Sequence, residues 1–274
     1  MSSYDGHAVR NRRAMNLDIV IPVYNEGANI TRVLDALRAS VRTPFRILIC
    51  YDRDDDNTLP VLAQYPAGLE LHLVRNRGQG PHGAITSGFA ESSAPAVVVY
   101  PADDIHNAGM LDAMVDKYEA GCDIVAASRF IPGGCMERCP WLKSVLVRAS
   151  AFTLYHLARI PTHDASNGFR LFSRRTIEQI PIESTMGFTY SLELLVKAHR
   201  LGWKIGEVPA RWFERSAGSS RFRVLRWLPA YLRWYFYAFA TTFFRRGPQS
   251  IVLRQPCPAT PEPCARFEPK VPSP

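Results

Sequence analysis

Acidic side chains gather at two places in the first half of the chain. Four of the five residues from 52 to 56 are aspartates, and Asp103 and Asp104 directly follow an apolar segment. Repulsion among neighbouring carboxylates must be offset, and a nucleotide base, a ribose or a metal ion could do this. An adjacent aspartate pair suits Mg²⁺, which takes one or two carboxylates and completes its shell with phosphate oxygens and water. A helix N-cap is the alternative interpretation of such a pair.

A glycine turn, Gly78-Gln79-Gly80, follows another apolar segment. Glycine at such a turn lets the backbone approach a ligand closely. The turn lacks the Gly-x-Gly-x-x-Gly spacing after the first strand that dinucleotide-binding dehydrogenases use. The sequence therefore disfavours a dehydrogenase.

These residues need a frame that brings them together. The sequence predicts buried strands at 17–23, 45–50, 69–74, 96–100 and 123–127. Apolar residues recur at helical spacing from Ile30 to Leu37, and helices are also expected at 83–91 and 110–120. Strands separated by helices predict an α/β fold with a mostly parallel central sheet. Ligands bind beyond the carboxyl ends of such strands, where both aspartate groups and the glycine turn lie.

The composition is that of an ordinary globular protein. The chain has 274 residues, a net charge of +8 and 47% hydrophobic residues. Six cysteines are too few for a disulfide scaffold, and the N-terminal residues lack the apolar segment of a signal peptide. We therefore expect a reducing, cytoplasmic compartment. The basic excess favours a membrane surface or a phosphorylated ligand, and we expect no nucleic acid because no nucleic-acid-binding motif accompanies it.

We expect four regions along the chain. Residues 1–15 are predicted to be a disordered arm, and the proline-rich residues 247–274 a disordered tail. Residues 16–222 are predicted to form the α/β domain, and residues 223–246 a separate helix. In the second half of the chain we expect helices at 141–159, 191–201 and 224–244, and strands at 168–172 and 203–213.

The predicted C-terminal helix is amphipathic and aromatic. Residues 221–246 include six arginines and no acid. The aromatic residues with a polar edge are Trp227, Tyr231, Trp234, Tyr235 and Tyr237. Aromatic rings flanked by arginine suit a membrane interface, and Pro229 and Arg233 interrupt any spanning segment. We expect peripheral contact with the inner face of the membrane, with a core helix that closes the domain as the alternative.

Several motifs occur in a familiar order. They are IPVYNE at 21–26, DNT at 56–58, GQGPHGAITSGF at 78–89, PADD at 101–104, SRF at 128–130 and DASNGFRLFSRR at 164–175. In these motifs the chain resembles the family 2 glycosyltransferases, and most closely the dolichol-phosphate mannose synthase branch. The resemblance implies a single GT-A (Rossmann-like) domain that uses a nucleotide sugar.

The resemblance also implies roles for individual residues. The donor would be bound by Pro22, Tyr24, Glu26, Asp52, Gly80 and Asp103. The acceptor would be bound by Arg129, Arg170, Glu193, Arg215, Ser220 and Arg221. Asp103 matches the second aspartate of the family's metal motif, so Mg²⁺ or Mn²⁺ is the implied cofactor. The first aspartate of that motif is Pro101 here, which has no ligand atom, and the polar residue two positions after Asp103 is Ile105.

The expected reaction is the inverting transfer of a hexose of the mannose or glucose type. The donor would be GDP- or UDP-linked and the acceptor a polyprenyl or dolichyl phosphate. We expect catalysis from Asp103, Asp104, Arg129 and Arg170. An ionised phosphate acceptor needs cations, which the two arginines would supply, rather than a general base. A hydroxyl acceptor, such as a glycolipid or a cell-wall saccharide, is one alternative, with Asp104 or Glu193 as base. A nucleotide-sugar-binding pseudoenzyme is the other, motivated by Pro101.

Overall fold

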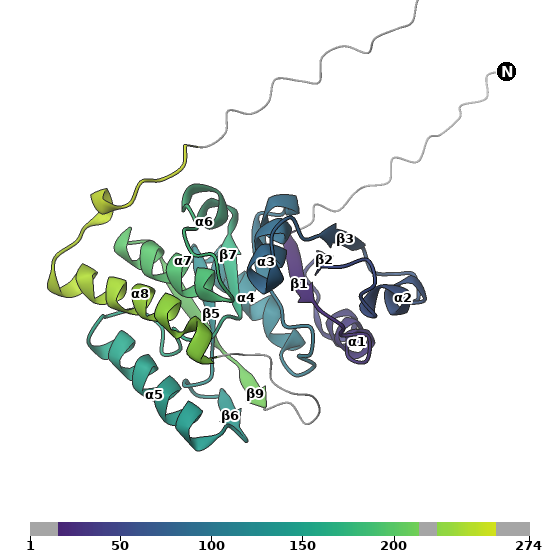
Figure 1. Ribbon diagram of the computed structural model, residues 1–274, viewed down its shortest axis with the longest axis horizontal. Helices are drawn as coiled ribbons and strands as arrows, with labels where there is room; N and C mark the ends of the chain where they lie inside the picture. The colour runs from purple at the N-terminus through teal and green to yellow at the C-terminus, as the bar shows by residue number, and fades with distance from the viewer. Residues whose placement is uncertain (1–15, 214–223, 256–274) are drawn as a thin grey trace, which may run out of the picture.

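A seven-stranded sheet forms the centre of the protein (Figure 1). The computed structural model describes residues 16–213 and 224–255. The strands are ordered β3-β2-β1-β4-β7-β5-β8. Their bounds are β1 (Leu17–Val23), β2 (Phe45–Tyr51), β3 (Leu71–Arg75), β4 (Ala96–Val99), β5 (Ile124–Ser128), β7 (Arg170–Ser173) and β8 (Ile205–Pro209).

All neighbouring strands of this sheet are parallel except at β7. That strand lies between β4 and β5 and pairs antiparallel with both of them. The chain winds outward from β1 to β2 and β3 and then returns to place β4 on the other side of β1. The carboxyl ends of β1 and β4 are therefore neighbours at a topological switch point, where ligands bind in sheets of this kind.

Helices cover both faces of the sheet, so the architecture has three layers. One face carries α1 (Ile30–Ser40), α2 (Thr58–Ala63) and α4 (Leu111–Glu119). The other face carries α3 (Gly80–Glu91), α5 (Trp141–His156), α6 (Arg174–Gln179), α7 (Thr189–Arg200) and α8 (Val224–Phe243). Alternate residues of β1 serve the two layers, since Ile19 and Ile21 pack against the first group and Val20 against the second. The predicted α/β class is confirmed.

The structure differs from the predicted elements mainly in short segments. A second, two-stranded sheet joins β6 (Cys135–Glu137) to β9 (Arg211–Phe213). The single strand predicted at 203–213 is thus divided between two sheets. Strand β6 and the six-residue helices α2 and α6 were not predicted, because segments this short carry no readable periodicity. The remaining elements are two short 3₁₀ turns, Ala108–Met110 and Pro248–Ser250.

Helix α8 packs on the domain as an integral element. Trp234 and Ala238 are buried in the same core as α7, rather than in a separate unit beginning at residue 223. The chain then continues to residue 255, and the Arg254 N–H donates to the Gln179 carbonyl at 2.8 Å. Residues 247–255 therefore do not form the disordered segment that we predicted. The predicted arm at 1–15 and the rest of the tail lie outside the described residues.

Within the part of the chain that the structure describes, no helix combines the length and apolarity needed to cross a membrane.

Candidate active site

The turn after β2 is locked to the turn after β1. The backbone N–H groups of Asn25, Glu26 and Gly27 donate in succession to the side chains of Asp56, Thr58 and Asn57, at 2.9, 3.0 and 2.9 Å. Two further aspartates of the acidic turn are paired with arginines, Asp54 with Arg75 and Asp55 with Arg53. The chain's own groups thus offset most of the acidic cluster, and Asp52 is the member that these contacts leave out.

Asp52 and Gly80, both predicted donor-binding residues, are brought together by Asn76. The Asn76 amide donates to a carboxylate oxygen of Asp52 and, at 3.1 Å, to the Gly80 carbonyl. Its own carbonyl accepts from the Gly78 N–H at 2.7 Å. Gly80 has φ +60°, a conformation that favours glycine. Asn76 directly follows β3, where ligand-site residues are expected, but its residue type and position alone assigned it no role.

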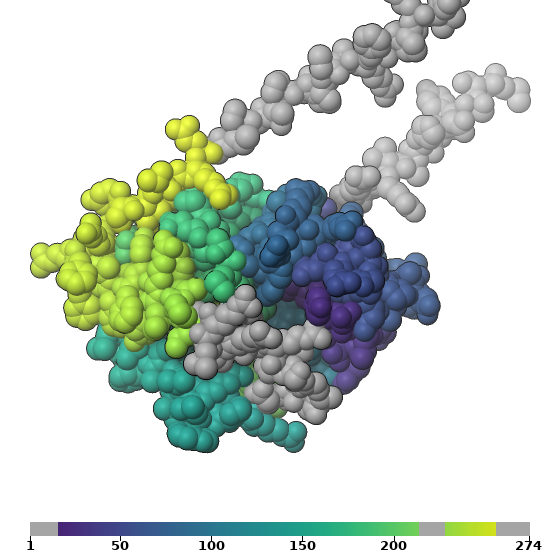
Figure 2. Space-filling model, in the orientation of Figure 1, coloured from purple at the N-terminus to yellow at the C-terminus, as the bar shows by residue number. Residues whose placement is uncertain are grey.

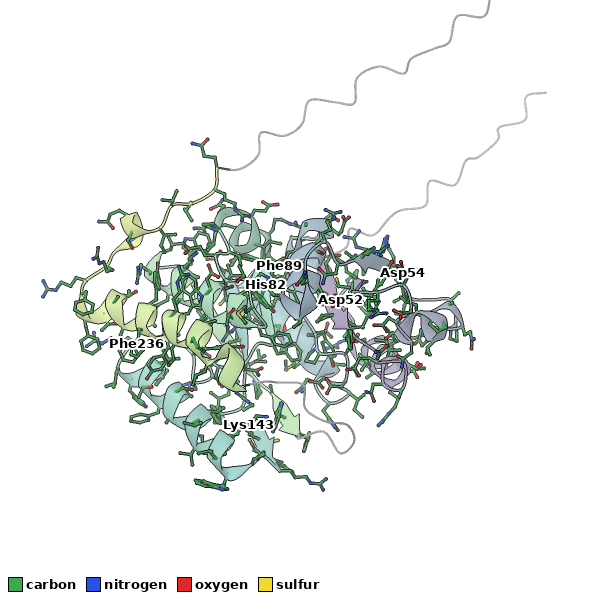
Figure 3. The ribbon with its side chains drawn as sticks, viewed as in Figure 1. Asp52, Asp54, His82, Phe89, Lys143 and Phe236 are labelled. Carbon is green, nitrogen blue, oxygen red and sulfur yellow. The ribbon has the colours of Figure 1, made fainter. Side chains whose placement is uncertain are left out.

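Of the predicted base and ribose contacts, Tyr24 lines a pocket beside these turns. Tyr24 is exposed, and together with Asn25, Arg53, Asp55 and Asp56 it lines a shallow pocket. Glu26 is half-buried and accepts from the Asn29 side chain at 2.8 Å. Pro22 lies in β1 itself and is also half-buried. Figure 3 labels Asp52 and Asp54, which lie on this side of the molecule.

Asp104 belongs to the architecture of the turn after β4. Its two carboxylate oxygens accept from the N–H groups of His106 and Asn107 and from the Asn107 amide, at 2.8, 3.0 and 2.6 Å. Asn107 also exchanges two hydrogen bonds with the Arg211 backbone, which ties the turn to β9. Burial raises the pKa of Asp104, and these hydrogen bonds oppose that rise. We therefore correct its predicted catalytic role, because its carboxylate closes a turn.

Asp103 is the half-buried neighbour in the same turn. It lies beyond β4, beside the end of β1, which is the position expected for a group that meets a donor diphosphate. Among the described residues, no group of three or more His, Cys, Asp or Glu side chains could hold a metal ion. Mg²⁺ ordinarily takes one or two carboxylates and completes its shell with substrate phosphates and water, and the single carboxylate of Asp103 fits such a site.

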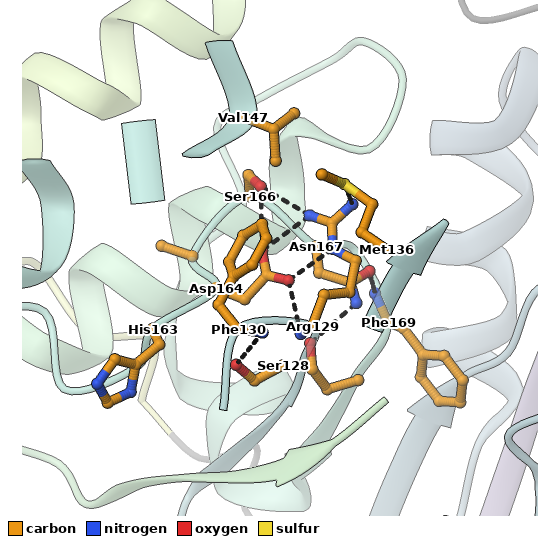
Figure 4. A network of polar contacts seen from close by, with 12 residues as sticks. Ser128, Arg129, Phe130, Met136, Val147, His163, Asp164, Ser166, Asn167 and Phe169 are labelled. Carbon is orange, nitrogen blue, oxygen red and sulfur yellow. Dashed lines mark hydrogen bonds and ion pairs between the residues drawn. The ribbon is translucent and has the colours of Figure 1, made fainter. Parts of the chain in front are cut away.

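Arg129 directly follows β5 and is held by Asp164 (Figure 4). Its Nε and Nη2 donate to the two Asp164 oxygens at 2.6 and 2.8 Å, and its N–H donates to the same carboxylate at 3.0 Å. Nη2 also donates to Ser166, and Nη1 lies 3.8 Å from the Met136 sulfur. A bidentate pair of this kind fixes the plane of the guanidinium. Asp164 was present in the DASNGFR motif, but its partner could not be identified from the sequence.

Arg170 lies beneath this network and has no exposed surface. Its Nη1 donates to the Ser191 carbonyl and hydroxyl, and its Nη2 donates to the Ala165 carbonyl. Burial lowers the pKa of Arg170 to about 10, against the opposing effect of Asp164. The guanidinium therefore ties the 164–166 segment to α7. This corrects the prediction that Arg170 contacts a phosphate itself.

Glu193 is also buried, on α7. Its carboxylate accepts from the N–H groups of Glu183 and Ser184 at 2.6 and 2.8 Å and from the Lys197 ammonium at 2.7 Å. All of these partners belong to α7 or to the loop that precedes it, so Glu193 has no surface to offer an acceptor. The prediction that it binds the acceptor is corrected accordingly. Arg215, Ser220 and Arg221 lie outside the described residues.

Comparison with solved structures identifies the fold as GT-A. Glucosyl-3-phosphoglycerate synthase from Mycobacterium tuberculosis, in complex with Mn²⁺, UDP and phosphoglyceric acid, superimposes with a TM-score of 0.58. The match covers 83% of this chain and 78% of that chain at 18% sequence identity. At this level of identity the comparison establishes the fold alone.

The family profile described as glycosyl transferase family 2 matches residues 18–180, and the chain belongs to this family. Its relatives include the polyprenol monophosphomannose synthase of Mycolicibacterium smegmatis, 26% identical over 74% of this chain and 79% of that protein. Another is the dolichol-phosphate mannosyltransferase of Pyrococcus furiosus, 24% identical over 80% of this chain and 64% of that protein. The protein is a glycosyltransferase, and the predicted family resemblance is confirmed.

Proposed function

We propose that this glycosyltransferase moves a hexose from a nucleotide diphosphate sugar to a polyprenyl or dolichyl phosphate at the inner face of a membrane. The names of the relatives, a polyprenol monophosphomannose synthase and a dolichol-phosphate mannosyltransferase, support a lipid phosphate acceptor and a sugar of the mannose type. The observation that carries the proposal is the state of the carboxylates on the acceptor side.

Three carboxylates that could have served as a general base already accept hydrogen bonds within the chain. Asp104, Asp164 and Glu193 each accept several hydrogen bonds from the chain's own backbone and side chains. A hydroxyl acceptor needs a base, because its pKa lies far above 7. A phosphate monoester is already ionised at neutral pH and needs a cation to orient it. Arg129 is the cation that the family motif favours, and Asp164 fixes its guanidinium, while 8% of the side chain's surface stays exposed.

The transfer then needs no proton to be removed. A phosphate oxygen of the lipid attacks the anomeric carbon, and the bond from that carbon to the donor diphosphate breaks. The electron pair leaves with the nucleoside diphosphate, and attack from the opposite side inverts the anomeric configuration. Asp103, at the end of β4, is the residue that we expect to hold Mg²⁺ or Mn²⁺ there. A bound cation would supply Lewis-acid stabilisation of the departing diphosphate.

We expect the turns after β1, β2 and β3 to bind the nucleotide of the donor. Tyr24 and Glu26 would meet the base and ribose, and Asp52, oriented by Asn76, would accept a hydrogen bond from the base. The Gly80 backbone lies against the same asparagine. GDP-linked and UDP-linked sugars are both candidates for the donor.

The test is a transfer assay with the purified full chain. Labelled GDP- and UDP-sugars are each incubated with polyprenyl phosphate and with Mg²⁺, Mn²⁺ or EDTA. We expect label in a lipid that mild acid hydrolyses, because a glycosyl phosphate is acid-labile, and we expect EDTA to abolish its formation. An acid-stable labelled product would instead identify a hydroxyl acceptor. Binding of one nucleotide sugar without turnover on any acceptor would identify a pseudoenzyme. Either of these two results would overturn the proposal.

A further inference from the structure

The outer face of α5 exposes large apolar side chains. Trp141 is 76% exposed and Leu146 57% exposed, and Leu142, Val145 and Phe152 are exposed on the same side. Trp141 and Val145 are four residues apart, as are Leu142 and Leu146, and Phe152 follows Val145 by seven, which places all five on one side of the helix. Soluble proteins rarely leave so large a contiguous apolar patch in water unless something binds it.

The inner side of α5 faces the Arg129 network. Ala151 and Leu154 are buried against the domain. Figure 4 draws Val147 over the cluster formed by Arg129, Asp164 and Ser166. The Arg148 guanidinium lies 5.1 Å from the centre of the Phe130 ring, next to Arg129. Helix α5 therefore separates the proposed acceptor site from whatever covers its outer face.

Helix α8 lies beside α5 and also exposes apolar side chains. The Thr153 and Tyr235 hydroxyls are 2.8 Å apart, and the Thr242 hydroxyl donates to the Ala158 carbonyl at 2.8 Å. Figures 1 and 2 place the two helices next to each other on one face of the molecule. On α8 the exposed apolar residues include Leu228, Leu232, Phe243 and Phe236, which is 64% exposed.

Basic side chains outnumber acidic ones on this surface, where Arg233 of α8 pairs with Glu183 at 2.7 Å. Neither α5 nor α8 contains an aspartate or glutamate. Lys143 and Arg148 lie on α5, and Arg245 and Arg246 follow α8 directly. Lys143 and Phe236 are labelled in Figure 3 on the side of the molecule away from Asp52 and Asp54. Long basic side chains around exposed tryptophan and phenylalanine are the pattern of a surface that lies in the headgroup region of an anionic membrane.

We propose that the outer faces of α5 and α8 together form one docking surface that inserts into a bilayer containing anionic phospholipid. This rests on the proposed function, which it deepens by naming the membrane contact and its orientation. Docking through both helices brings the Arg129–Asp164 pair close beneath the lipid headgroups, separated from them by α5. A lipid-linked phosphate would then reach Arg129 past an end of α5, one helix diameter (~10 Å) below the bilayer surface, while its isoprenoid chain stays in the membrane.

The test is vesicle flotation of the full chain with matched variants. Leu146→Ser removes an apolar side chain from α5 and Phe236→Ser one from α8. Leu73→Ser is the control, because Leu73 is 56% exposed on β3, outside this surface. With phosphatidylcholine–phosphatidylglycerol vesicles, each helix variant should lower the partition coefficient by about tenfold, as expected for a buried large side chain. The control should bind these vesicles as the unmodified chain does. The unmodified chain should bind vesicles of phosphatidylcholine alone more weakly than vesicles that contain phosphatidylglycerol.

Three results would overturn this inference. Leu146→Ser could bind vesicles like the unmodified chain, or Leu73→Ser could lose binding to the same extent. The chain could also be a dimer in solution that Leu146→Ser converts to a monomer, which would mean that a second copy covers the face.

A separate assay distinguishes failure of the proposed function. All variants should still transfer sugar to a short, water-soluble isoprenyl phosphate without vesicles. If no variant transfers sugar to any phosphate acceptor, yet vesicle binding depends on both helices, the proposed function fails and the docking surface stands.

Discussion

Asp103 and Asp104 are neighbours in the sequence, yet their carboxylates have different surroundings. Asp104 accepts three hydrogen bonds that close its own turn, whereas Asp103 lies at the sheet edge beside β1. An adjacent acidic pair therefore divides into one structural group and one candidate ligand group. The sequence could not assign these roles, because a turn that caps itself and a metal site use the same residue type.

We predict that Asp104→Asn destabilises the protein. An amide NH₂ in place of one carboxylate oxygen would face a donor, and leaving such a group unsatisfied costs about 1–3 kcal/mol. Chemical denaturation should show this loss, and Asp116→Asn, at an exposed position on α4, should show no comparable loss. A stability equal to that of the unmodified chain would contradict the structural role of Asp104.

Arg129 is the residue on which acceptor binding should depend most. Lysine cannot reproduce its two parallel hydrogen bonds to Asp164. We expect Arg129→Lys to lower kcat/KM for the lipid phosphate by about 100-fold, the equivalent of losing one charge-assisted contact. The KM for the nucleotide sugar should not change. Arg42→Lys is the matched control. Arg42 also pairs with an aspartate, Asp112, but it lies just after α1 and its side chain is 92% exposed. Equal kinetics for the two variants would exclude Arg129 from acceptor binding.

At the scale of elements, Asp18 joins the start of β1 to β2 and to the loop before β4. Its buried carboxylate accepts two hydrogen bonds from Arg46 and others from Ser92, Ser93 and Ala94. Burial alone would raise the pKa of Asp18, but these donors, with Arg46 the strongest, hold it below its ordinary value. This network fixes the register of the strands whose far ends carry the donor site.

The stability that Asp18 contributes should depend on pH in a defined direction. Since its pKa is lowered on folding, the contribution is complete above the unfolded pKa near 3.8 and is lost as the pH falls through the folded value. At pH 7, Asp18→Asn should lower the free energy of unfolding by about 3 kcal/mol, because Arg46 loses its charged partner. Below the folded pKa the difference between the two proteins should shrink. A difference that stays constant across this range would contradict the assignment.

Sequence patterns predicted the long helices and strands. They did not predict strand direction or side-chain burial, which depend on individual tertiary contacts. The apolar segments at 17–23 and 45–50 became β1 and β2 almost unchanged. The direction of β7 was not readable, because alternation indicates a strand but not which way it runs. Arg170 and Glu193 matched motif positions yet are buried, since a motif records residue type and not the side to which a side chain turns.

At the scale of the whole molecule, ligand binding should stabilise the folded chain against heat. A nucleoside diphosphate at 100 times its dissociation constant adds about 2.7 kcal/mol to the stability. For a chain of this size we expect Tm to rise by about 5–10 °C. Thermal melts with GDP and UDP should therefore identify the base. Asp52→Asn should reduce the rise for the cognate nucleotide, and an undiminished rise would remove Asp52 from base recognition.

The reversed strand β7 has a consequence for how such a protein can change over evolutionary time. Strand β7 runs antiparallel to β4 and β5, so β7 begins at the edge of the sheet where β4 and β5 end. The segment that precedes β7 therefore brings Asp164 to the ligand edge. Every residue expected to meet the donor lies before β5, and Arg129 with its supporting segment lies after it. A single genetic crossover near Gly121 would exchange the acceptor half of the gene and leave the nucleotide half intact. Descendants of one ancestor could thus inherit the same donor and diverge in what they glycosylate.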